Sequence, residues 1–316
     1  MKLSVVIPIY NVGEFVPRCL DSIYSQGIDE NLFEVICVND GSTDNSSAVV
    51  KDYALRHENL VLIEQANQGV SVARNNGLDA AKGEFVTFVD PDDSLCEGAL
   101  GKLFADFEVN GDADMVVCNA LETLGTVPDW RQFFTEGRVY TCEEVLNGGF
   151  VYGSVWGAYY RMDFIRKNEI RFIPKVRNGE DTNFVMQVLY HTNTIKFTDI
   201  DLYVLIGREG SATKVFSKKR IDTMIYTVKT VYEQRKKLIL KPGNKIALDY
   251  MMYSLMSNLV KDTIATKGVG YRYLAKSGVK ECCNFTLSDN TSFLRKKMEL
   301  LTKSFSLYYF LNRIKG

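Results

Sequence analysis

The chain has 316 residues, of which 46% are hydrophobic and 24% charged, as in ordinary soluble proteins with a sizeable core. No apolar run reaches the roughly 20 residues that cross a bilayer, and the seven cysteines include no CxxC pair, so we expect a cytoplasmic protein with reduced thiols and exclude a membrane-spanning or zinc-finger protein. The net charge of −1 hides a division between residues 1–130, with 7 Lys/Arg and 22 Asp/Glu, and residues 131–316, with 31 and 17.

The first 120 residues alternate between apolar, β-branched runs and segments with helical spacing. Strands that alternate with helices of about 10–15 residues predict an α/β fold, with a mostly parallel twisted sheet and helices on both faces. Strands are expected at 3–9, 33–39, 59–64, 84–90 and 113–120, and helices at 14–26, 43–57, 69–82 and 96–111.

Beyond residue 130 the pattern is less regular. Residues 137–190 contain short aromatic-rich segments such as FVYGSVWGAYYR, followed by a helix around NFVMQVLYH. After residue 214 the chain is helical and basic, with Lys and Arg between Ile, Val, Tyr and Leu. We therefore expect a separate helical region at 214–316.

Polar residues follow each of the first four predicted strands. Because ligands of open α/β sheets bind beyond the carboxyl ends of the strands, these residues are candidates for a binding site. The set consists of Pro8, Tyr10 and Asn11 at strand one, Asn39, Asp40, Gly41 and Ser42 at strand two, Asn67, Gln68 and Gly69 after strand three, and Asp90, Asp92 and Asp93 at strand four.

The acids after strand four lie within four residues and repel one another, so they need a counter-charge. The acidic half of the chain would also repel a diphosphate, unless a divalent cation bridges carboxylate and phosphate oxygens. The alternative is that Asp92 or Asp93 caps the next helix. The neighbouring strand-end loops favour the cation, with Asp92 and Asp90 as its candidate ligands.

Three further side chains each have two interpretations. Asp40 is suited to accept a nucleobase N–H, or to shape the turn at Gly41. Arg74 is suited to reach a phosphate, or to pair with a nearby acid. Tyr10 is suited to stack on a base, or to pack against the sheet.

A second acidic pair, Glu180–Asp181, follows Gly179 and precedes the predicted helix at 183–191. A carboxylate at this position could withdraw the proton from an attacking hydroxyl group. The alternative is that the pair only caps the amino-terminal end of the helix.

Together these segments resemble the family 2 glycosyltransferases, enzymes of the GT-A fold that transfer a sugar from a nucleotide donor. The resemblance is carried, in chain order, by VVIPIYN, Glu14, VNDGSTDNS, NQGVSVARNNGL, GEFVTFVDPDDSL and GEDTNF. It implies a glycosyltransferase domain at 1–213, with a nucleotide-sugar half at 1–115 and an acceptor half at 116–213.

The resemblance also implies a role for each matching residue. Asp40 would read the base, most often uracil, Asp90 would contact the ribose or diphosphate, and Asp92 would hold Mn²⁺ or Mg²⁺. Asp181 would be the catalytic base, with Glu180 beside it contacting the acceptor. The nucleotide-sugar site would further include Pro8, Tyr10, Asn11, Glu14, Asn67 and Arg74.

The activity so implied is metal-dependent, inverting hexosyl transfer from a UDP-sugar to a glycan or lipid-linked glycan in surface-polysaccharide assembly. The chain has no QxxRW motif, so a single addition per encounter is expected rather than processive synthesis. A nucleotidyltransferase is disfavoured because the first strand-end loop has no basic residue before Arg18. The remaining alternative is a non-catalytic nucleotide-sugar-binding scaffold.

The basic half leaves two questions open. Arg208, in REGSAT, would clamp the diphosphate or would lie on a solvated loop. Residues 291–316 hold 6 Lys/Arg and 1 Asp/Glu, with helical spacing of apolar residues. This helix would contact an anionic membrane, at the inner face of the cell membrane, or would pack on the protein. No nucleic-acid-binding motif occurs. The apolar set is Leu294, Met298, Leu301, Phe305 and Tyr308.

Overall fold

The computed structural model describes residues 1–122, 130–148, 153–207, 216–241, 243–283, 297, 299–301 and 303–315. The chain forms two compact units. Unit 1 comprises residues 1–141, 152–175 and 192–208, and unit 2 comprises residues 142–151, 176–191 and 209–316. Residues 176–191 group with the C-terminal helices, and the domain boundary expected at 213/214 stays a prediction.

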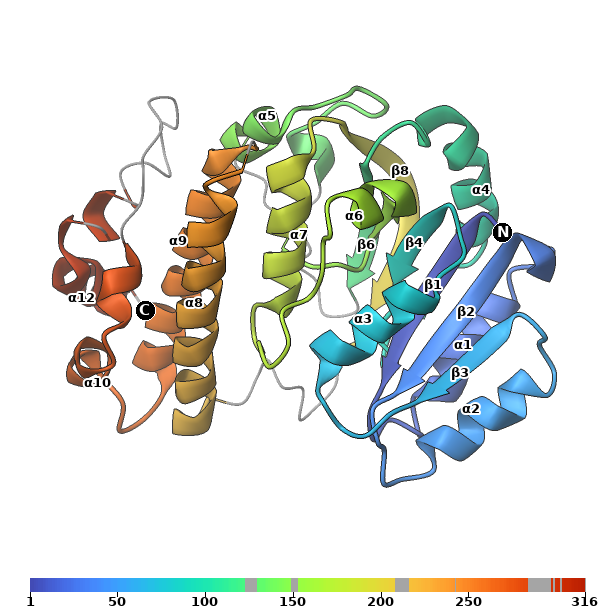
Figure 1. Ribbon diagram of the computed structural model, residues 1–316, viewed down its shortest axis with the longest axis horizontal. Helices are drawn as coiled ribbons and strands as arrows, with labels where there is room; N and C mark the ends of the chain where they lie inside the picture. The colour runs from blue at the N-terminus through green and yellow to red at the C-terminus, as the bar shows by residue number, and fades with distance from the viewer. Residues whose placement is uncertain are drawn as a thin grey trace. The chain divides into compact units, whose positions relative to one another are not determined.

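Unit 1 is built on one eight-stranded sheet with the order β3-β2-β1-β4-β7-β6-β8-β5 (Figure 1). The first four strands are parallel, β7 is antiparallel to both β4 and β6, β6 and β8 are parallel, and β5 is antiparallel to β8. The strands are β1 Leu3–Ile9, β2 Phe33–Asn39, β3 Leu60–Glu64, β4 Phe85–Phe88, β5 Ser94–Leu95, β6 Met115–Glu122, β7 Ala158–Arg161 and β8 Ile195–Leu205.

The expected α/β fold is confirmed, with one difference in the sheet. The predicted strand at 113–120, β6, does not pair with β4, because β7 lies between them and pairs with both. β7 has only four residues and lies in the aromatic-rich region, where no alternating pattern indicates a strand. The second half of the sheet is therefore mixed rather than parallel.

Helices cover both faces of the sheet in unit 1 (Figure 1). Leu3, Val5 and Ile7 of β1 belong to the hydrophobic core that also contains residues of α1, α2 and α4. Val6 points to the opposite face, where Gly77 of α3 leaves no room for a Cβ, which would lie 2.4 Å from Val6 Cγ1. The helices are α1 Val16–Tyr24, α2 Ser46–Ala54, α3 Val70–Ala80, α4 Ala99–Asn110 and α6 Met162–Lys167, with 3₁₀ helices η1 Glu30–Leu32 and η2 Trp130–Gln132.

Unit 2 is helical, and its frame is the antiparallel pair α8 and α9. The start of α8 meets the end of α9 through Arg220 and Asp262, and the end of α8 meets the start of α9 through Arg235 and Asp249. Both arginine–aspartate pairs are largely buried. The helices are α5 Cys142–Asn147, α7 Glu180–His191, α8 Lys218–Leu238, α9 Lys245–Ala265, α10 Tyr271–Lys276 and α12 Phe305–Lys315, with the 3₁₀ helix η3 Val279–Cys283.

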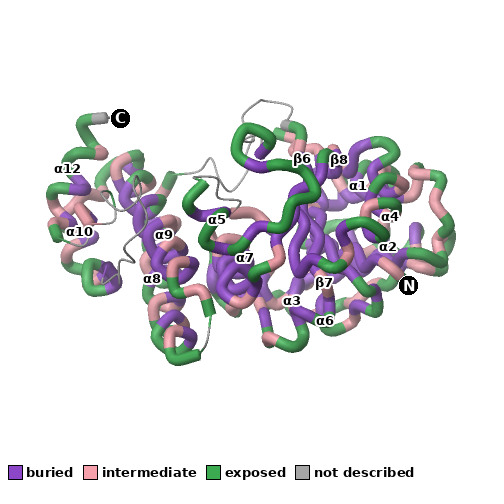
Figure 2. Tube along the Cα trace, turned by 90° about the horizontal axis from the view of Figure 1, so that it is seen from above, coloured by how far each residue is buried: buried purple, intermediate pink, exposed green. Residues whose placement is uncertain are grey.

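Burial along the chain follows this division into elements. Figure 2 shows the strands of unit 1 largely buried, with exposed segments concentrated in loops and on the outer turns of helices. Every residue of β1 and β2 is buried, as expected for central strands covered on both faces. Among the helices that the structure describes, none is both long and apolar enough to span a bilayer.

Candidate functional site

The candidate site consists of four loops of unit 1, residues 10–15, 40–45, 65–69 and 89–94, which follow β1, β2, β3 and β4. The strand order β3-β2-β1-β4 means that the chain moves outward from β1 to β3 and then crosses back past β1 to β4. The direction of crossing reverses between β1 and β4, and ligands of open α/β sheets bind at such a switch point.

Strand register brings the loops to one level. Ile9 pairs with Asn39, and Asn39 pairs with Glu64, so the loops after β1, β2 and β3 begin side by side. β4 ends three residues earlier along β1, with Phe88 opposite Val6. The structure therefore gathers the predicted nucleotide-site residues of β1 to β4 at one edge of one sheet.

Pro8 is buried in a central strand, where a residue without an N–H is normally excluded. Val6 accepts a hydrogen bond from Val89, and residues two apart in a strand face the same side. The missing N–H of Pro8 therefore faces β4 at a level where β1–β4 pairing has already ended, so no ladder bond is lost. Beyond it, Tyr10 is 48% exposed and Glu14 is also exposed.

Hydrogen bonds fasten the first two loops to each other. Asn11, with a left-handed backbone (φ 51°), donates its N–H to Ser42 Oγ (3.0 Å) and accepts from Thr43 N at Oδ1 (2.8 Å). Gly13 N donates to Asp44 Oδ2 (3.0 Å). The side chain of Asn11 thus holds the loop after β2 in addition to any contact with a ligand.

Asp40 is 3% exposed and organises the loop after β3. Its Oδ1 accepts hydrogen bonds from Gln65 Nε2 and Gln68 N (both 2.7 Å), and its Oδ2 accepts from Gly69 N (2.8 Å). A carboxylate offers about four acceptor positions, so these three donors leave room for one more. The loop-shaping interpretation of Asp40 is therefore present in the structure, and base recognition stays a prediction.

Two loops approach each other closely at Gly41. Its φ is +70°, and a Cβ on this residue would lie 2.9 Å from the backbone N of Asn67. Only glycine accommodates both the left-handed backbone and this contact without strain. Asn67 itself is exposed on the loop after β3, as a residue that contacts a ligand must be.

The buried Arg74 forms an ion pair with Asp90, whose side chain is 28% exposed. Arg74 Nη2 lies 2.8 Å from Asp90 Oδ1, the arginine side chain is 3% exposed, and its guanidinium lies over the ring of Phe172 at 5.3 Å. The sequence suggested phosphate binding or pairing with an acid for Arg74, and the structure shows the pairing. This guanidinium supplies counter-charge to the acids after β4.

The three acids after β4 have different surroundings. Asp93 is buried. Its carboxylate accepts hydrogen bonds from Tyr203 Oη of β8 (2.7 Å) and from the backbone N of Ile206, directly after β8 (2.8 Å). Burial raises the pKa of Asp93 to about 6, more than these hydrogen bonds lower it. Asp92 is partly buried, and its carbonyl accepts from Arg18. Asp93 is therefore held by β8 and the residue that follows it, whereas Asp90 and Asp92 are the less buried acids of the three.

Among the described residues, no group of three or more His, Cys, Asp or Glu is arranged to hold a metal ion. Mg²⁺ and Mn²⁺ at phosphate sites take one or two carboxylates, together with phosphate oxygens and water. Asp92 and Asp90 supply oxygen ligands of this kind and number, so the residues fit such an ion.

Glu180 and Asp181 begin α7 in unit 2. Glu180 Oε2 accepts from Gly179 N (3.1 Å), and Gly179 O accepts from Asn183 N (2.9 Å). The negative side chains lie where the helix dipole favours them. Capping geometry is thus present, while the catalytic role of Asp181 stays a prediction.

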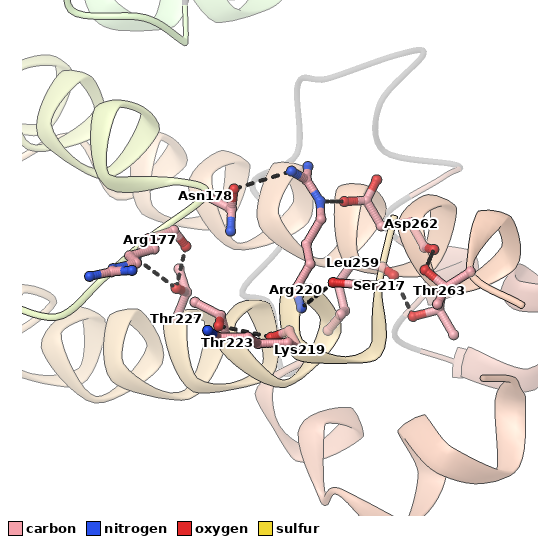
Figure 3. A network of polar contacts seen from close by, with 11 residues as sticks. Arg177, Asn178, Ser217, Lys219, Arg220, Thr223, Thr227, Leu259, Asp262 and Thr263 are labelled. Carbon is pink, nitrogen blue, oxygen red and sulfur yellow. Dashed lines mark hydrogen bonds and ion pairs between the residues drawn. The ribbon is translucent and has the colours of Figure 1, made fainter. Parts of the chain in front are cut away.

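The loop before Asp181 is fastened to α8 and α9 (Figure 3). Thr227 Oγ1 donates to Arg177 O (2.7 Å), and Arg220 binds Asn178 Oδ1 (3.3 Å) and Asp262 Oδ2 (2.6 Å). Gly179 has φ +138°, and a Cβ there would lie 2.5 Å from Leu255 Cδ2. The approach to α7 is therefore shaped by the C-terminal helices.

Comparison with known proteins identifies the family. A sequence profile described as Glycosyl transferase family 2 matches residues 4–168, which is more than half of the chain. The chain belongs to glycosyl transferase family 2. The expected resemblance is thereby confirmed, and the switch-point loops of unit 1 lie within the matched part.

Several family 2 relatives can be named. The uncharacterized glycosyltransferase YibD of Escherichia coli K12 is 33% identical over 222 residues, 64% of this chain and 60% of that protein. The poly(ribitol-phosphate) beta-glucosyltransferase of Bacillus spizizenii W23 is 30% identical over 219 residues, 68% of this chain and 34% of that protein. The chain spans between 34% and 65% of the length of the first curated relatives it matches.

A solved structure confirms the GT-A fold expected for a family 2 chain. S. aureus TarS 1–349, in complex with UDP-GlcNAc, is similar with a TM-score of 0.67 and 22% identity, over 99% of this chain and 90% of that chain. At this level of identity the likeness concerns the fold.

Two residues of the candidate site were missed from the sequence. Gln65, directly after β3, binds Asp40, but a single glutamine in a loop gives no signal of this. Tyr203 binds Asp93, but it lies on β8, which the sequence did not predict as a strand. Arg208, the expected diphosphate clamp, lies outside the described residues.

Proposed function

We propose that this protein transfers a sugar from a UDP-sugar to a hydroxyl group of a glycan or lipid-linked glycan during surface-polysaccharide assembly, on the cytoplasmic side of the membrane. The observation that carries the proposal is the set of switch-point loops around Asp40 and the Arg74–Asp90 pair, in a family 2 chain. UDP-GlcNAc in TarS and the poly(ribitol-phosphate) substrate of a named relative support the donor and acceptor classes.

Residues of unit 1 would bind the donor. The exposed ring of Tyr10 is suited to stack on the base, and the remaining acceptor position of Asp40 is suited to a base N–H. Asp90 would contact the ribose or diphosphate, with its orientation fixed by Arg74. The other members of the proposed donor site are Pro8, Asn11, Glu14 and Asn67.

Residues of unit 2 would carry the proton transfer. The acceptor oxygen attacks the anomeric carbon on the face opposite the diphosphate, while Asp181 takes the hydroxyl proton. The bond between the anomeric carbon and the diphosphate oxygen breaks, UDP leaves with the bonding electrons, and the anomeric configuration inverts. Glu180 would contact the acceptor beside Asp181, and Arg208 would clamp the diphosphate.

Mn²⁺ or Mg²⁺ would be held by Asp92 together with Asp90. When bound, the ion would neutralise charge on the departing diphosphate. The Arg74 guanidinium, 2.8 Å from Asp90, would offset part of the negative charge of the acids that hold the ion.

The test is a transfer assay with a panel of UDP-sugars and glycan acceptors, with and without Mn²⁺, combined with calorimetry of UDP binding. Asp181→Asn should lower transfer about 100-fold or more, while UDP affinity stays within about 2-fold. Asp92→Ala should abolish the Mn²⁺-dependent part of UDP affinity. The exposed acid Asp163, changed to Asn, is the matched control. Full transfer by Asp181→Asn contradicts the proposal, and tight UDP binding without transfer by the unchanged protein favours the scaffold alternative.

The C-terminal helix carries a second, membrane-related part of the proposal. The expected apolar stripe is buried at Leu301, Phe305 and Tyr308, which pack inside unit 2, and its other two members lie outside the described residues. A different stripe of α12 is exposed, by 38% to 81%, with the spacing i, i+3, i+4, i+7. It consists of Leu307, Phe310, Leu311 and Ile314.

The occupant of this stripe that charge favours is an anionic lipid surface. Residues 271–315 hold 9 Lys/Arg and 3 Asp/Glu, and Lys303, Arg313 and Arg272 are exposed. Apolar insertion with flanking cations is the usual mode of an interfacial helix.

Sedimentation with phosphatidylglycerol-containing and pure phosphatidylcholine vesicles tests this part. Phe310→Ser with Leu311→Ser should lower binding to the anionic vesicles about 10-fold or more. Leu240→Ser, at a site 85% exposed outside the stripe, is the control. Unchanged binding, or equal binding to both vesicle types, overturns lipid contact through α12.

A further inference from the structure

Asp40 is the end of a directed chain of side-chain hydrogen bonds within unit 1. Gln65, at the carboxyl end of β3, donates through Nε2 to Asp40 Oδ1 at 2.7 Å. Asn76, on α3, donates through Nδ2 to Gln65 Oε1. A loop residue and a helix residue thus act in series on one buried carboxylate.

The chemistry of the carboxylate sets the direction of the chain. An ionised Asp40 only accepts, so Gln65 must turn its amide NH₂ toward it. This turns the amide oxygen of Gln65 toward Asn76, which must in turn present its own NH₂. Each amide has only one orientation that satisfies its neighbour, so this series of hydrogen bonds has one low-energy arrangement.

The arrangement determines what Asp40 has left to offer. Oδ1 already accepts from two donors, Gln65 Nε2 and Gln68 N, whereas Oδ2 accepts from Gly69 N alone. The remaining acceptor direction is therefore on Oδ2. Without Gln65, Oδ1 would accept from Gln68 N alone and would also have a free acceptor direction, so an incoming N–H would no longer be directed to Oδ2.

We infer that Gln65 and Asn76 are positioning residues that aim Asp40 at an N–H of the donor base and so make the site prefer uracil to cytosine. This inference rests on the proposed function, in which Asp40 accepts from the base. Uracil carries a donor at N3, whereas cytosine carries an acceptor there, which a carboxylate repels. Fixing the direction of Oδ2 thus favours UDP over CDP.

A substitution that keeps the shape of Gln65 but adds a charge gives a specific test. In Gln65→Glu, the introduced carboxyl group would face Asp40 at about the 2.7 Å that now separates Gln65 Nε2 from Oδ1. Two carboxylates at this distance repel, and the pKa of the introduced group is raised toward neutral pH. When protonated, the introduced group donates an O–H to Asp40 and restores the native contact.

The neighbouring charged residue Glu64 already has partners away from Gln65. Glu64 is held by Lys51 (3.2 Å) and Ser47 (2.5 Å) of α2.

Calorimetry should measure UDP and CDP binding at constant Mn²⁺, from pH 5.5 to pH 8.0. The result is expressed as the ratio of variant to native affinity at each pH. The titration of the nucleotide then cancels.

We expect Gln65→Glu to bind UDP about 10-fold more weakly than the native protein at pH 8.0 and within about 2-fold of it at pH 5.5. Gln65→Leu should lose about 10-fold at every pH, and the ratio of UDP to CDP affinity should fall in both variants. Gln132→Glu adds the same charge at an exposed position of η2 and is the matched control.

Asn76→Asp provides a second, independent variant. Its carboxylate can only accept, so the Gln65 amide would turn and present its oxygen to Asp40. UDP affinity should then fall about 10-fold, and the preference for UDP over CDP should be lost. Thermal melting establishes that each variant is folded. If the native protein binds UDP but Gln65→Glu and Asn76→Asp both bind it equally well at pH 8.0, the inference is overturned alone. If the native protein binds no UDP, the proposed function fails and the inference with it.

Discussion

The two units use polar side chains in different ways. In unit 1, Asp40 and Arg74 act where parallel strands end, and they order loops that already begin side by side because of strand register. In unit 2, the buried pairs Arg235–Asp249 and Arg220–Asp262 join the two ends of α8 and α9. Polar contacts therefore shape a site on an existing sheet in unit 1, whereas in unit 2 they are part of the frame itself.

This difference predicts where substitutions act. A polar change in the loops of unit 1 should alter ligand binding more than folding. A polar change between the helices of unit 2 should alter folding first. The following experiments test this contrast.

The largest effect is expected at Arg235, which is 5% exposed. Arg235→Met leaves the buried Asp249 without its arginine, and breaking such a pair costs about 3–5 kcal/mol of the free energy of unfolding. Urea unfolding followed by circular dichroism measures the loss. Combining Arg235→Met with Asp249→Leu should recover most of it, because an apolar pair of similar volume is tolerated.

Lys236→Met is the matched control, since Lys236 pairs with Glu233 at the surface and exposed pairs contribute about 0–1 kcal/mol. UDP affinity of folded Arg235→Met should equal that of the native protein. If Arg235→Met instead lowered UDP affinity strongly and left stability unchanged, the expectation that polar changes in unit 2 act first on folding would be wrong.

The next effect concerns pH and Asp93. Its pKa is raised by burial to about 6 in the folded protein, against 3.8 ordinarily. A raised pKa means that the stability contribution is present below pH 3.8 and is lost as the pH rises through 6. Between pH 4 and pH 7.5 this group should remove about 2–3 kcal/mol from the free energy of unfolding. Because other groups also titrate, the measured quantity is the difference between native protein and Asp93→Asn in urea unfolding with EDTA. Parallel pH profiles would contradict this assignment.

Gly41→Ala should lower both the free energy of unfolding and the affinity for UDP, with a smaller loss of stability than the changes above. The left-handed backbone costs about 1–2 kcal/mol for a residue with a Cβ, and the contact with Asn67 adds displacement of the loop after β3. Gly137→Ala is a close control, because Gly137 has φ +69° with nothing within 4 Å of the added Cβ. Calorimetry should show weaker UDP binding in Gly41→Ala only. Equal UDP affinity in both variants would show that the loop contact does not matter for binding.

The smallest effect is expected at Thr227. Thr227→Val removes the hydroxyl that donates to Arg177 O and should cost about 1 kcal/mol, measured by urea unfolding. Thr223→Val, where the hydroxyl bonds within its own helix to Lys219 O, should change stability by less than about 0.5 kcal/mol. A transfer rate lowered in Thr227→Val but not in Thr223→Val would link this contact to the proposed base Asp181.

The sequence predicted the parallel half of the sheet well, because buried strands and amphipathic helices alternate there with clear periods. It did not predict β7, whose four residues become a strand only by pairing with β4 and β6. It also could not tell which of Asp90, Asp92 and Asp93 would be buried. That choice depends on Tyr203 and Ile206 of a segment more than 100 residues away.

Site residues were easier to find than their partners. Strand-end position alone indicates Asp40 and Asp90, since the sheet edge collects them. The partners Gln65 and Arg74 come from a loop and a helix whose geometry is set by packing, so pairing could be proposed for Arg74 but not assigned. The grouping of α7 with the C-terminal helices likewise follows from contacts with α8 and α9 that no local pattern encodes.

One turn of α3 ties separate parts of unit 1 together. Arg74 binds Asp90, Asn75 exchanges two hydrogen bonds with the backbone of Phe172 (2.8 and 2.9 Å), and Asn76 binds Gln65. Successive residues of a helix point about 100° apart, so three neighbours in sequence reach three different segments. One turn of α3 carries all three attachments. A small rotation of α3 would therefore move Asp90, the loop at Gln65 and the segment at Phe172 together.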